Sequence, residues 1–267
     1  LCLTDEQVLD VDLLAEPDAV ALLESLVDQP LPRATLRHKA QRIGGLPLAL
    51  QLAASAGEAS MPAGSGTDTT GDLPRHVRSS LLLAWQSLDA DAQEVLAGCS
   101  VFRGGFTLAD AVAVLDAAGV ASAGSGLALL GDRGLLRLRT GRSGTRLVLD
   151  QPLQGFAAEY LAESPERQSR LQQAHAEVYS RLGTNAAVAV LSGPRAFELQ
   201  GRWVDELENL AVGLVRALDA RRARPAARLG RALHEARVLG QDVEDLDALT
   251  RRLSVLRGMD PGDRLRL

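Results

Sequence analysis

The chain has 267 residues, of which 46% are hydrophobic and 24% are charged, as is usual for a globular protein with a buried core. Its formal net charge of -5 argues against broad binding to a nucleic-acid backbone, which requires an excess of Lys and Arg on one face. Only 3% of the residues are aromatic, which argues against a platform that stacks single-stranded bases.

The sequence contains no apolar run of about 18 residues, so we expect no membrane contact and a cytoplasmic location. The chain begins with Leu1 rather than Met, and we expect it to be part of a longer protein.

The first part of the chain predicts a strand followed by a small helical unit. Residues 1–14 alternate loosely between apolar and polar side chains, which favours a strand. Glu16-Pro17-Asp18 then predicts the start of a helix, because proline and carboxylates are favoured in a first turn. Further helices are expected at 31–42 and 48–56. Between them lies Gly44-Gly45-Leu46-Pro47, where the glycines allow a turn and the proline fixes φ for the next helix.

A second pattern begins after a polar stretch. Residues 57–72 are rich in Gly, Ser and Thr, which indicates a flexible linker, placed at 59–72. Thr107 is the expected N-cap of one of the helices that follow. The predicted elements are helices at 79–88, 91–98, 108–115 and 127–132, β-like runs at 135–139 and 146–149, and a closing helix at 152–162. Helices followed by a β-hairpin are the order of a winged-helix domain.

Beyond Ser164-Pro165 the whole pattern is helical. The expected helices span 166–182, 185–192, 203–219, 223–238 and 242–257. A run of antiparallel, TPR-like helix pairs is the simplest arrangement for them. The fold class predicted for the chain is therefore mainly α, with a short β-hairpin.

The sequence shows none of the motifs or spacings typical of a catalytic or metal site. Lys39 is the only lysine and follows no glycine loop, which excludes a G-x-x-x-x-G-K-[ST] phosphate loop. Cys2 and Cys99 lie in apolar surroundings, and we expect small buried side chains rather than a disulfide or a zinc site. The histidines at 38, 76, 175 and 234 lack metal-ligand spacing and are expected to be ordinary surface or helix residues. We therefore predict no catalytic residue and no metal site.

Several stretches resemble the bacterial STAND (NB-ARC-like) ATPases of the LuxR-type and antibiotic-synthesis regulators. Gly45-Leu46-Pro47-Leu48-Ala49 resembles the GLPLA box of their helical lid. Residues 100–108, Ser-Val-Phe-Arg-Gly-Gly-Phe-Thr-Leu, are similar to the start of their winged-helix domain. Residues 147–149 and 156–161 resemble the wing and closing helix of that domain. Glu206-Leu207-Glu208-Asn209-Leu210 matches the E-x-x-N-L found early in the helical repeats that follow it.

The resemblance implies a domain order and a set of nucleotide contacts. The implied domains are the terminal strand of a nucleotide-binding α/β domain (1–15), a helical lid (16–58), the linker (59–72), a winged helix (73–163) and helical repeats (164–267). The implied nucleotide-binding residues are Gly45, Leu46, Pro47, Leu48 and Asp150. Many relatives carry a histidine at the position of Asp150, and a carboxylate there would repel a diphosphate.

The function implied by the resemblance is that of the regulatory part of a nucleotide-dependent signalling switch. ATP and ADP, with Mg, are implied for a longer parent ATPase, whereas this chain alone is expected to bind no cofactor and to catalyse no reaction. The implied partners are the other domains of the parent, a protein or effector on the helical region, and further copies of the protein on activation.

Two other functions remain open. The first is a DNA-binding winged-helix regulator, since Arg137, Arg139, Arg142 and Arg146 gather on the predicted hairpin. We expect these to form a solvated strand face instead, because the helix that would read bases, at 127–133, offers only one arginine, Arg133, and a carboxylate. The second is a helical protein-binding scaffold without nucleotide dependence.

Overall fold

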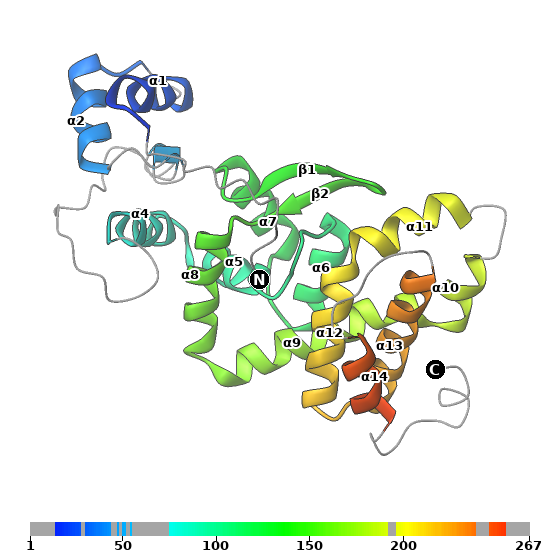
Figure 1. The fold of residues 1–267 in the computed structure, drawn as a ribbon. Helices are drawn as coiled ribbons and strands as arrows, with labels where there is room; N and C mark the ends of the chain where they lie inside the picture. The colour runs from blue at the N-terminus through cyan, green and yellow to red at the C-terminus, as the bar shows by residue number, and fades with distance from the viewer. Residues whose placement is uncertain are drawn as a thin grey trace. The chain divides into compact units, whose positions relative to one another are not determined.

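The computed structural model describes residues 14–27, 30–43, 47, 50–51, 54, 75–191, 196–238 and 246–254. Within these residues the fold is mainly helical and contains a two-stranded antiparallel sheet (Figure 1). The predicted fold class is confirmed at this level. The chain divides into two compact units, Leu1–Asp89 and Ala90–Leu267, which are described separately. The division falls inside the range 73–163, and the domain ranges drawn from the sequence stay predictions.

The first unit contains α1 (Glu16–Leu26), α2 (Arg33–Ile43) and α4 (Arg75–Gln86). Proline lies in the first turn of α1, as the sequence predicts. Helices α1 and α2 pack through a shared core made by Ala19, Val20, Leu23, Leu36, Ala40, Ile43 and Leu50. Leu50, Gln51 and Ala54 are helical, within the third helix expected at 48–56, and Pro47, just before that range, is helical too. The predicted linker and residues 1–13 of the predicted strand lie outside the described residues, whereas Leu14 and Ala15 are described and lie in no strand.

The second unit begins with α5 (Ala90–Cys99), α6 (Leu108–Ala117) and α7 (Ala123–Asp132). Thr107 caps α6, as predicted, because its Oγ1 accepts a hydrogen bond of 3.1 Å from the backbone N of Asp110. Cys99 is buried, and burial raises the pKa of its thiol to about 12. The expectation that this cysteine is a small buried side chain is confirmed, whereas Cys2 lies outside the described residues.

A β-ribbon follows, formed by β1 (Arg137–Gly141) and β2 (Gly144–Val148). The strands are antiparallel, with Arg137 opposite Val148 and Gly141 opposite Gly144, so only two residues form the turn. The ribbon therefore reaches further toward its tip than the sequence predicts. Phe106 adds a bridge to the other edge of β2, with two backbone hydrogen bonds to Leu147 of 2.8 and 2.9 Å. Helix α8 (Gln151–Ala162) then closes this half of the unit.

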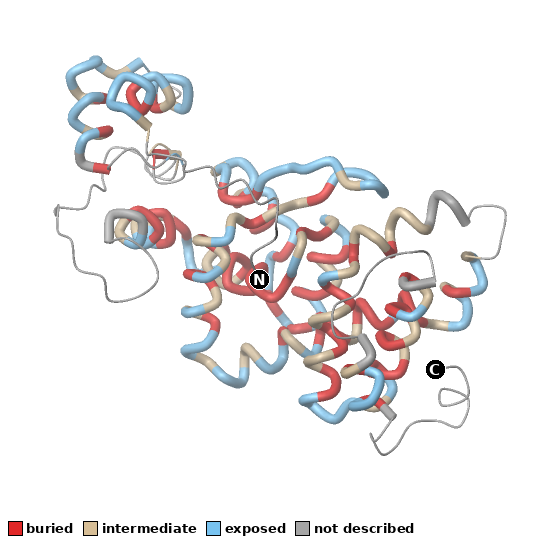
Figure 2. Tube along the Cα trace, viewed as in Figure 1, coloured by how far each residue is buried: buried red, intermediate tan, exposed pale blue. Residues whose placement is uncertain are grey.

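The remaining elements are helical: α9 (Pro165–Ser180), the 3-10 turn η1 (Arg181–Gly183), α10 (Asn185–Val190), α11 (Ala196–Asp205), α12 (Leu207–Asp219), α13 (Ala223–Val238) and α14 (Leu246–Ser254). Helix α12 packs against α9 and α13, and Figure 2 shows buried positions gathered where these helices meet. None of the described helices has the length and hydropathy that a membrane crossing requires.

The prediction of one helix over 203–219 is wrong. Helix α11 begins at Ala196, and the helical path breaks at Glu206, whose φ of -101° and ψ of 6° are not helical. The local sequence gives no reason for a break, since it contains neither Gly nor Pro at this point. The reason lies in the contact between the Glu206 carboxylate and Arg146 of β2.

A candidate functional site at the junction of the ribbon and helix α12

The structure describes two of the five residues that the resemblance assigns to a nucleotide. Gly45, Leu46 and Leu48 lie outside the described residues. Pro47 is helical and exposed, in the first unit. Asp150 belongs to the second unit, where it precedes α8 at the N-cap position and forms an ion pair with Arg137 of the ribbon. The charge of Asp150 is thus already matched by an arginine of its own unit.

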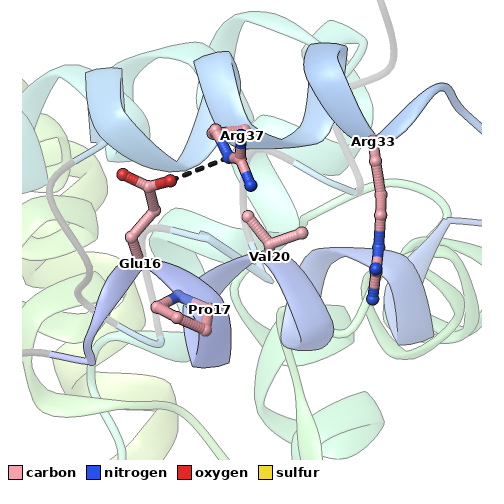
Figure 3. A pocket seen from close by; sticks show the side chains of 5 residues that line it. All are labelled: Glu16, Pro17, Val20, Arg33 and Arg37. Carbon is pink, nitrogen blue, oxygen red and sulfur yellow. Dashed lines mark ion pairs between the residues drawn. The ribbon is translucent and has the colours of Figure 1, made fainter.

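A small pocket opens between α1 and α2 in the first unit (Figure 3). Its lining residues are Glu16, Pro17, Val20, Arg33 and Arg37. Arg37 turns toward Glu16, with 2.9 Å between its Nε and Oε1 of the carboxylate. The cavity volume is about 150 Å³, below the 300–1,000 Å³ typical of ligand pockets. This pocket is too small to enclose a nucleotide.

The most unusual side-chain arrangement is a buried ion pair between the ribbon and α12. Arg146 of β2 is 1% exposed and Glu206 is 0% exposed. The guanidinium donates from Nη1 to Oε1 over 2.6 Å and from Nη2 to Oε2 over 3.0 Å, a bidentate geometry. Nη2 also donates to the carbonyl of Gly105, at 2.7 Å. Burial lowers the pKa of Arg146, but the hydrogen bond and charge of Glu206 outweigh it and raise this pKa above its ordinary value.

Asn209 extends this pair into a network. Its Nδ2 donates to the carbonyl of Gly105 (2.8 Å) and to Oε2 of Glu206 (2.9 Å). Its Oδ1 accepts from the backbone N of Arg103 at 2.7 Å. We call Gly105, Arg146, Glu206 and Asn209 the junction cluster. Through it, α12 is bonded both to the ribbon and to the loop between α5 and α6.

The backbone of Gly105 is suited to this position. Its φ of 89° lies in the left-handed region, which favours glycine. A Cβ atom here would lie 3.0 Å from the carbonyl oxygen of Leu147 and 3.2 Å from Cγ2 of Val148. A larger residue would therefore separate this loop from β2 and from the junction cluster.

A second acidic residue holds the tip of the ribbon. Asp205 accepts hydrogen bonds from the backbone N of Arg142 (3.0 Å) and of Ser143 (2.7 Å), and from the Ser143 hydroxyl (2.7 Å). Burial raises the pKa of Asp205, but these hydrogen bonds outweigh it, so the pKa lies below its ordinary value. Two adjacent residues between α11 and α12 thus bind the ribbon: Asp205 binds its turn, and Glu206 binds the middle of β2.

A neutral histidine lies beneath the cluster. His175 of α9 is buried, and its Nε2 lies 3.2 Å from Oδ1 of Asn209. Its ring contacts those of Phe102 and Tyr179, with centroids 5.5 and 4.6 Å away. Burial and then the charge of Arg216 lower the pKa of His175 to about 3, so the ring is uncharged at neutral pH. The expectation of an ordinary helix histidine missed this burial.

The structure corrects the expectation of a solvated arginine face on the hairpin for Arg146 alone, because Arg137, Arg139 and Arg142 are exposed. Arg146 is buried and ion-paired, and Arg137 is paired with Asp150. Arg139 is exposed, and its Nη2 donates to the carbonyl of Gly104 at 3.0 Å. A face with two arginines already paired to carboxylates has less charge to offer to phosphates than the sequence suggests.

The junction cluster unites two stretches that the sequence analysis considered separately, residues 100–108 and 206–210. The motifs in these two stretches are the only sign in the sequence that points to this site. No local pattern shows that the two stretches are in contact. Comparisons with known proteins add no relative, because no family model, no curated protein and no solved structure matches the chain.

Proposed function

We propose that the chain is the regulatory part of a nucleotide-dependent STAND signalling switch, in which a lid and a winged helix transmit the nucleotide state to a helical sensor region. The resemblance of the quoted motifs suggests this family. The order of α5, α6, α7, ribbon and α8 is compatible with a winged helix, and the packing of α9, α12 and α13 is compatible with TPR-like repeats.

The single observation that carries the proposal is the bonding of one motif to the other. Asn209 of the 206–210 stretch holds the backbone of Arg103 and Gly105 in the 100–108 stretch. A rotation of the ribbon half of the unit therefore displaces α12 with it, because buried polar contacts would otherwise be broken. In a switch, this junction would carry motion from the nucleotide side to the sensor side.

ATP or ADP, with Mg, would be bound mainly by the parent protein, with Gly45, Leu46, Pro47 and Leu48 as the adenine-side contact of this chain. Asp150 is less suited to such a role, because Arg137 already pairs with it. Activation would release the lid and lead to self-association, with a protein partner on the helical region. The chain alone would not hydrolyse ATP.

The DNA-binding alternative receives little support from the hairpin. Of its four arginines, Arg146 is buried and Arg137 is paired. Helix α7 has the sequence Ala-Gly-Ser-Gly-Leu-Ala-Leu-Leu-Gly-Asp and offers no Arg, Lys, Asn or Gln for base edges. If the chain binds DNA at all, the affinity and its salt dependence should accordingly be the same after Arg137, Arg139 and Arg142 are replaced together.

The proposal is tested by hydrogen exchange on the parent protein in its ADP-bound and ATP-bound states. Amides of 137–148 and of 206–219 should change protection together between the two states. Protection that changes in only one of the two segments, or in neither, would contradict the proposal. Binding of a partner to the helical region that is indifferent to nucleotide would favour the scaffold alternative.

A further inference from the structure

The ribbon has one covered edge and one open edge. On the covered side, Phe106 pairs with β2 through two backbone hydrogen bonds to Leu147, of 2.8 and 2.9 Å. On the other side, β1 pairs only with β2 in the described part of the chain, so it is the edge strand of the sheet (Figure 1). Residues 137–140 of this strand are all exposed. An edge strand of this kind presents backbone groups that can pair with another extended chain.

The register of the ribbon shows which backbone groups of β1 face outward. In an antiparallel pair, residues that bond to each other across the ladder alternate with residues whose N–H and C=O point to the outer edges. Leu147 is of the second kind, because its N–H and C=O bond Phe106 rather than β1. Leu138 lies directly opposite Leu147, so its own N–H and C=O point to the open edge. The same holds for Thr140, at the next alternate position.

The two faces of β1 differ in chemistry. Arg137 and Arg139 share the face of Arg146, since alternate residues of a strand point the same way and Arg139 is opposite Arg146. Arg137 pairs with Asp150, whereas Arg139 is exposed and forms no ion pair with a described carboxylate. Leu138 lies on the opposite face and is 74% exposed. The open edge is thus flanked by cationic side chains on one face and by a leucine on the other.

Charge decides which extended chain this edge suits. If β1 paired with the β1 strand of a second copy, the arginines of the two strands would lie close together, and like charges across a strand pair are destabilising. Charged side chains on an edge strand are one way in which proteins prevent such self-association. A strand with carboxylates at alternate positions would instead place them beside the guanidinium groups. Apolar side chains between the carboxylates would then lie on the face of Leu138.

We propose that β1 is a docking site for an extended acidic peptide of a partner protein, which adds a third strand to the ribbon and alternates carboxylate with apolar side chains. The backbone of Leu138 and Thr140 bonds the main chain of the peptide, and Arg139 binds one of its carboxylates. Leu138 contacts the apolar side chains. This partner differs from the one proposed for the helical region, and the inference does not depend on the proposed switch.

The test follows the fluorescence anisotropy of a labelled, end-capped peptide of alternating Glu and Val during titration with the whole chain. The peptide should bind with a Kd below about 1 mM, and added NaCl should weaken the binding. Two control peptides should each bind at least about tenfold more weakly. One has the same composition with Glu and Val in separate blocks, and the other has methylated backbone nitrogens, which keeps the side chains but prevents strand pairing.

Leu138→Pro is the main variant of the chain. Proline removes the outward N–H, whereas the ladder to β2 is made by the neighbouring residues, and an edge strand tolerates proline at such a position. The variant should weaken peptide binding by about tenfold or more, and Leu138→Ala, which keeps the N–H, by less. Arg139→Glu should weaken binding to a similar extent as Leu138→Pro. Arg170→Glu is the matched control, because Arg170 is an exposed arginine of α9, and it should bind like the wild type.

The proposal is overturned if the alternating peptide does not bind, or if the block or methylated peptide binds as tightly. It is also overturned if Leu138→Pro, folded as judged by the fluorescence of the buried Trp203, binds like the wild type. If Leu138→Pro does not fold, the two control peptides and Arg139→Glu decide. Duplex DNA that displaces the peptide and binds Leu138→Pro and the wild type equally would assign the arginines to phosphate recognition, against the proposal.

Discussion

Replacement of Glu206 by Gln tests the junction cluster most directly. The variant keeps the shape of the side chain but leaves the guanidinium of Arg146, which is 1% exposed, without a negative partner. Removal of one member of a buried ion pair costs about 3–5 kcal/mol. For a unit of this size, that corresponds to a fall in Tm of roughly 6–20 °C. No other acceptor replaces the lost carboxylate, since the buried Nε of Arg146 already has no hydrogen-bond partner among the described residues.

The double variant separates charge burial from other effects. Arg146→Met alone should also be destabilising, since it strands the carboxylate of Glu206. Arg146→Met combined with Glu206→Gln removes both charges, and the new amide is able to accept from Asn209. We expect the double variant to be more stable than either single variant. Glu208→Gln is the matched control: Glu208 is exposed, and its loss should change the free energy of unfolding by less than about 0.5 kcal/mol.

Urea unfolding followed by tryptophan fluorescence suits these variants. Trp203 of α11 is buried in the second unit, and a Trp85→Phe background removes the signal of the first unit. Hydrogen exchange of residues 137–148 adds a local readout, because the ribbon should open more easily once α12 no longer holds it. The reasoning is refuted if Glu206→Gln unfolds within about 0.5 kcal/mol of the wild type, or if the double variant costs the sum of the single ones.

Three further predictions follow from burial. His175 takes up a proton near pH 6.5 in the unfolded chain but only near pH 3 in the folded chain. As the pH falls from 6.5 to 3, the free energy of unfolding of the wild type should therefore decrease by about 1.4 kcal/mol per pH unit relative to His175→Gln, as measured by urea unfolding. Parallel pH profiles of the two proteins would contradict this. In a Cys2→Ser background, Cys99 should resist a disulfide reagent at pH 8 until the chain is unfolded, because its thiol stays protonated; rapid labelling of the native chain would show that the thiol is accessible. Gly183→Ala should lower the free energy of unfolding by about 1–3 kcal/mol in the same assay, because the new Cβ would collide with the carbonyl of Arg228. An unchanged free energy of unfolding would mean that η1 can move away from α13.

The elements that sequence reasoning located best have local causes. Pro17 and the acidic residues beside it place the start of α1, and Thr107 places the start of α6. Both signals act within one turn of helix, so they can be read without knowledge of the tertiary fold. The same holds for the β-like runs that indicate the ribbon.

The junction cluster has no such local cause. Glu206 interrupts a continuous helical pattern because its carboxylate meets Arg146, which is 60 residues away in the sequence. Arg146 in turn resembles its three exposed or paired neighbours on the hairpin until its partner is known. The quoted motifs marked the right stretches of chain, but which atoms meet is set by the packing of α12 against α9.

Ser164-Pro165, between α8 and α9, is an obvious place to divide the second unit into two fragments. The buried ion pair spans this boundary, because Arg146 lies before it and Glu206 after it. A piece that ends before α9 would keep the cation of Arg146 and lose its anion, while a piece that begins there would keep Glu206 and lose its cation. Each truncated product would carry one member of the pair without its partner. Expression plasmids for the second unit should therefore retain residues 90–267 as one stretch, which also keeps α13 against α12.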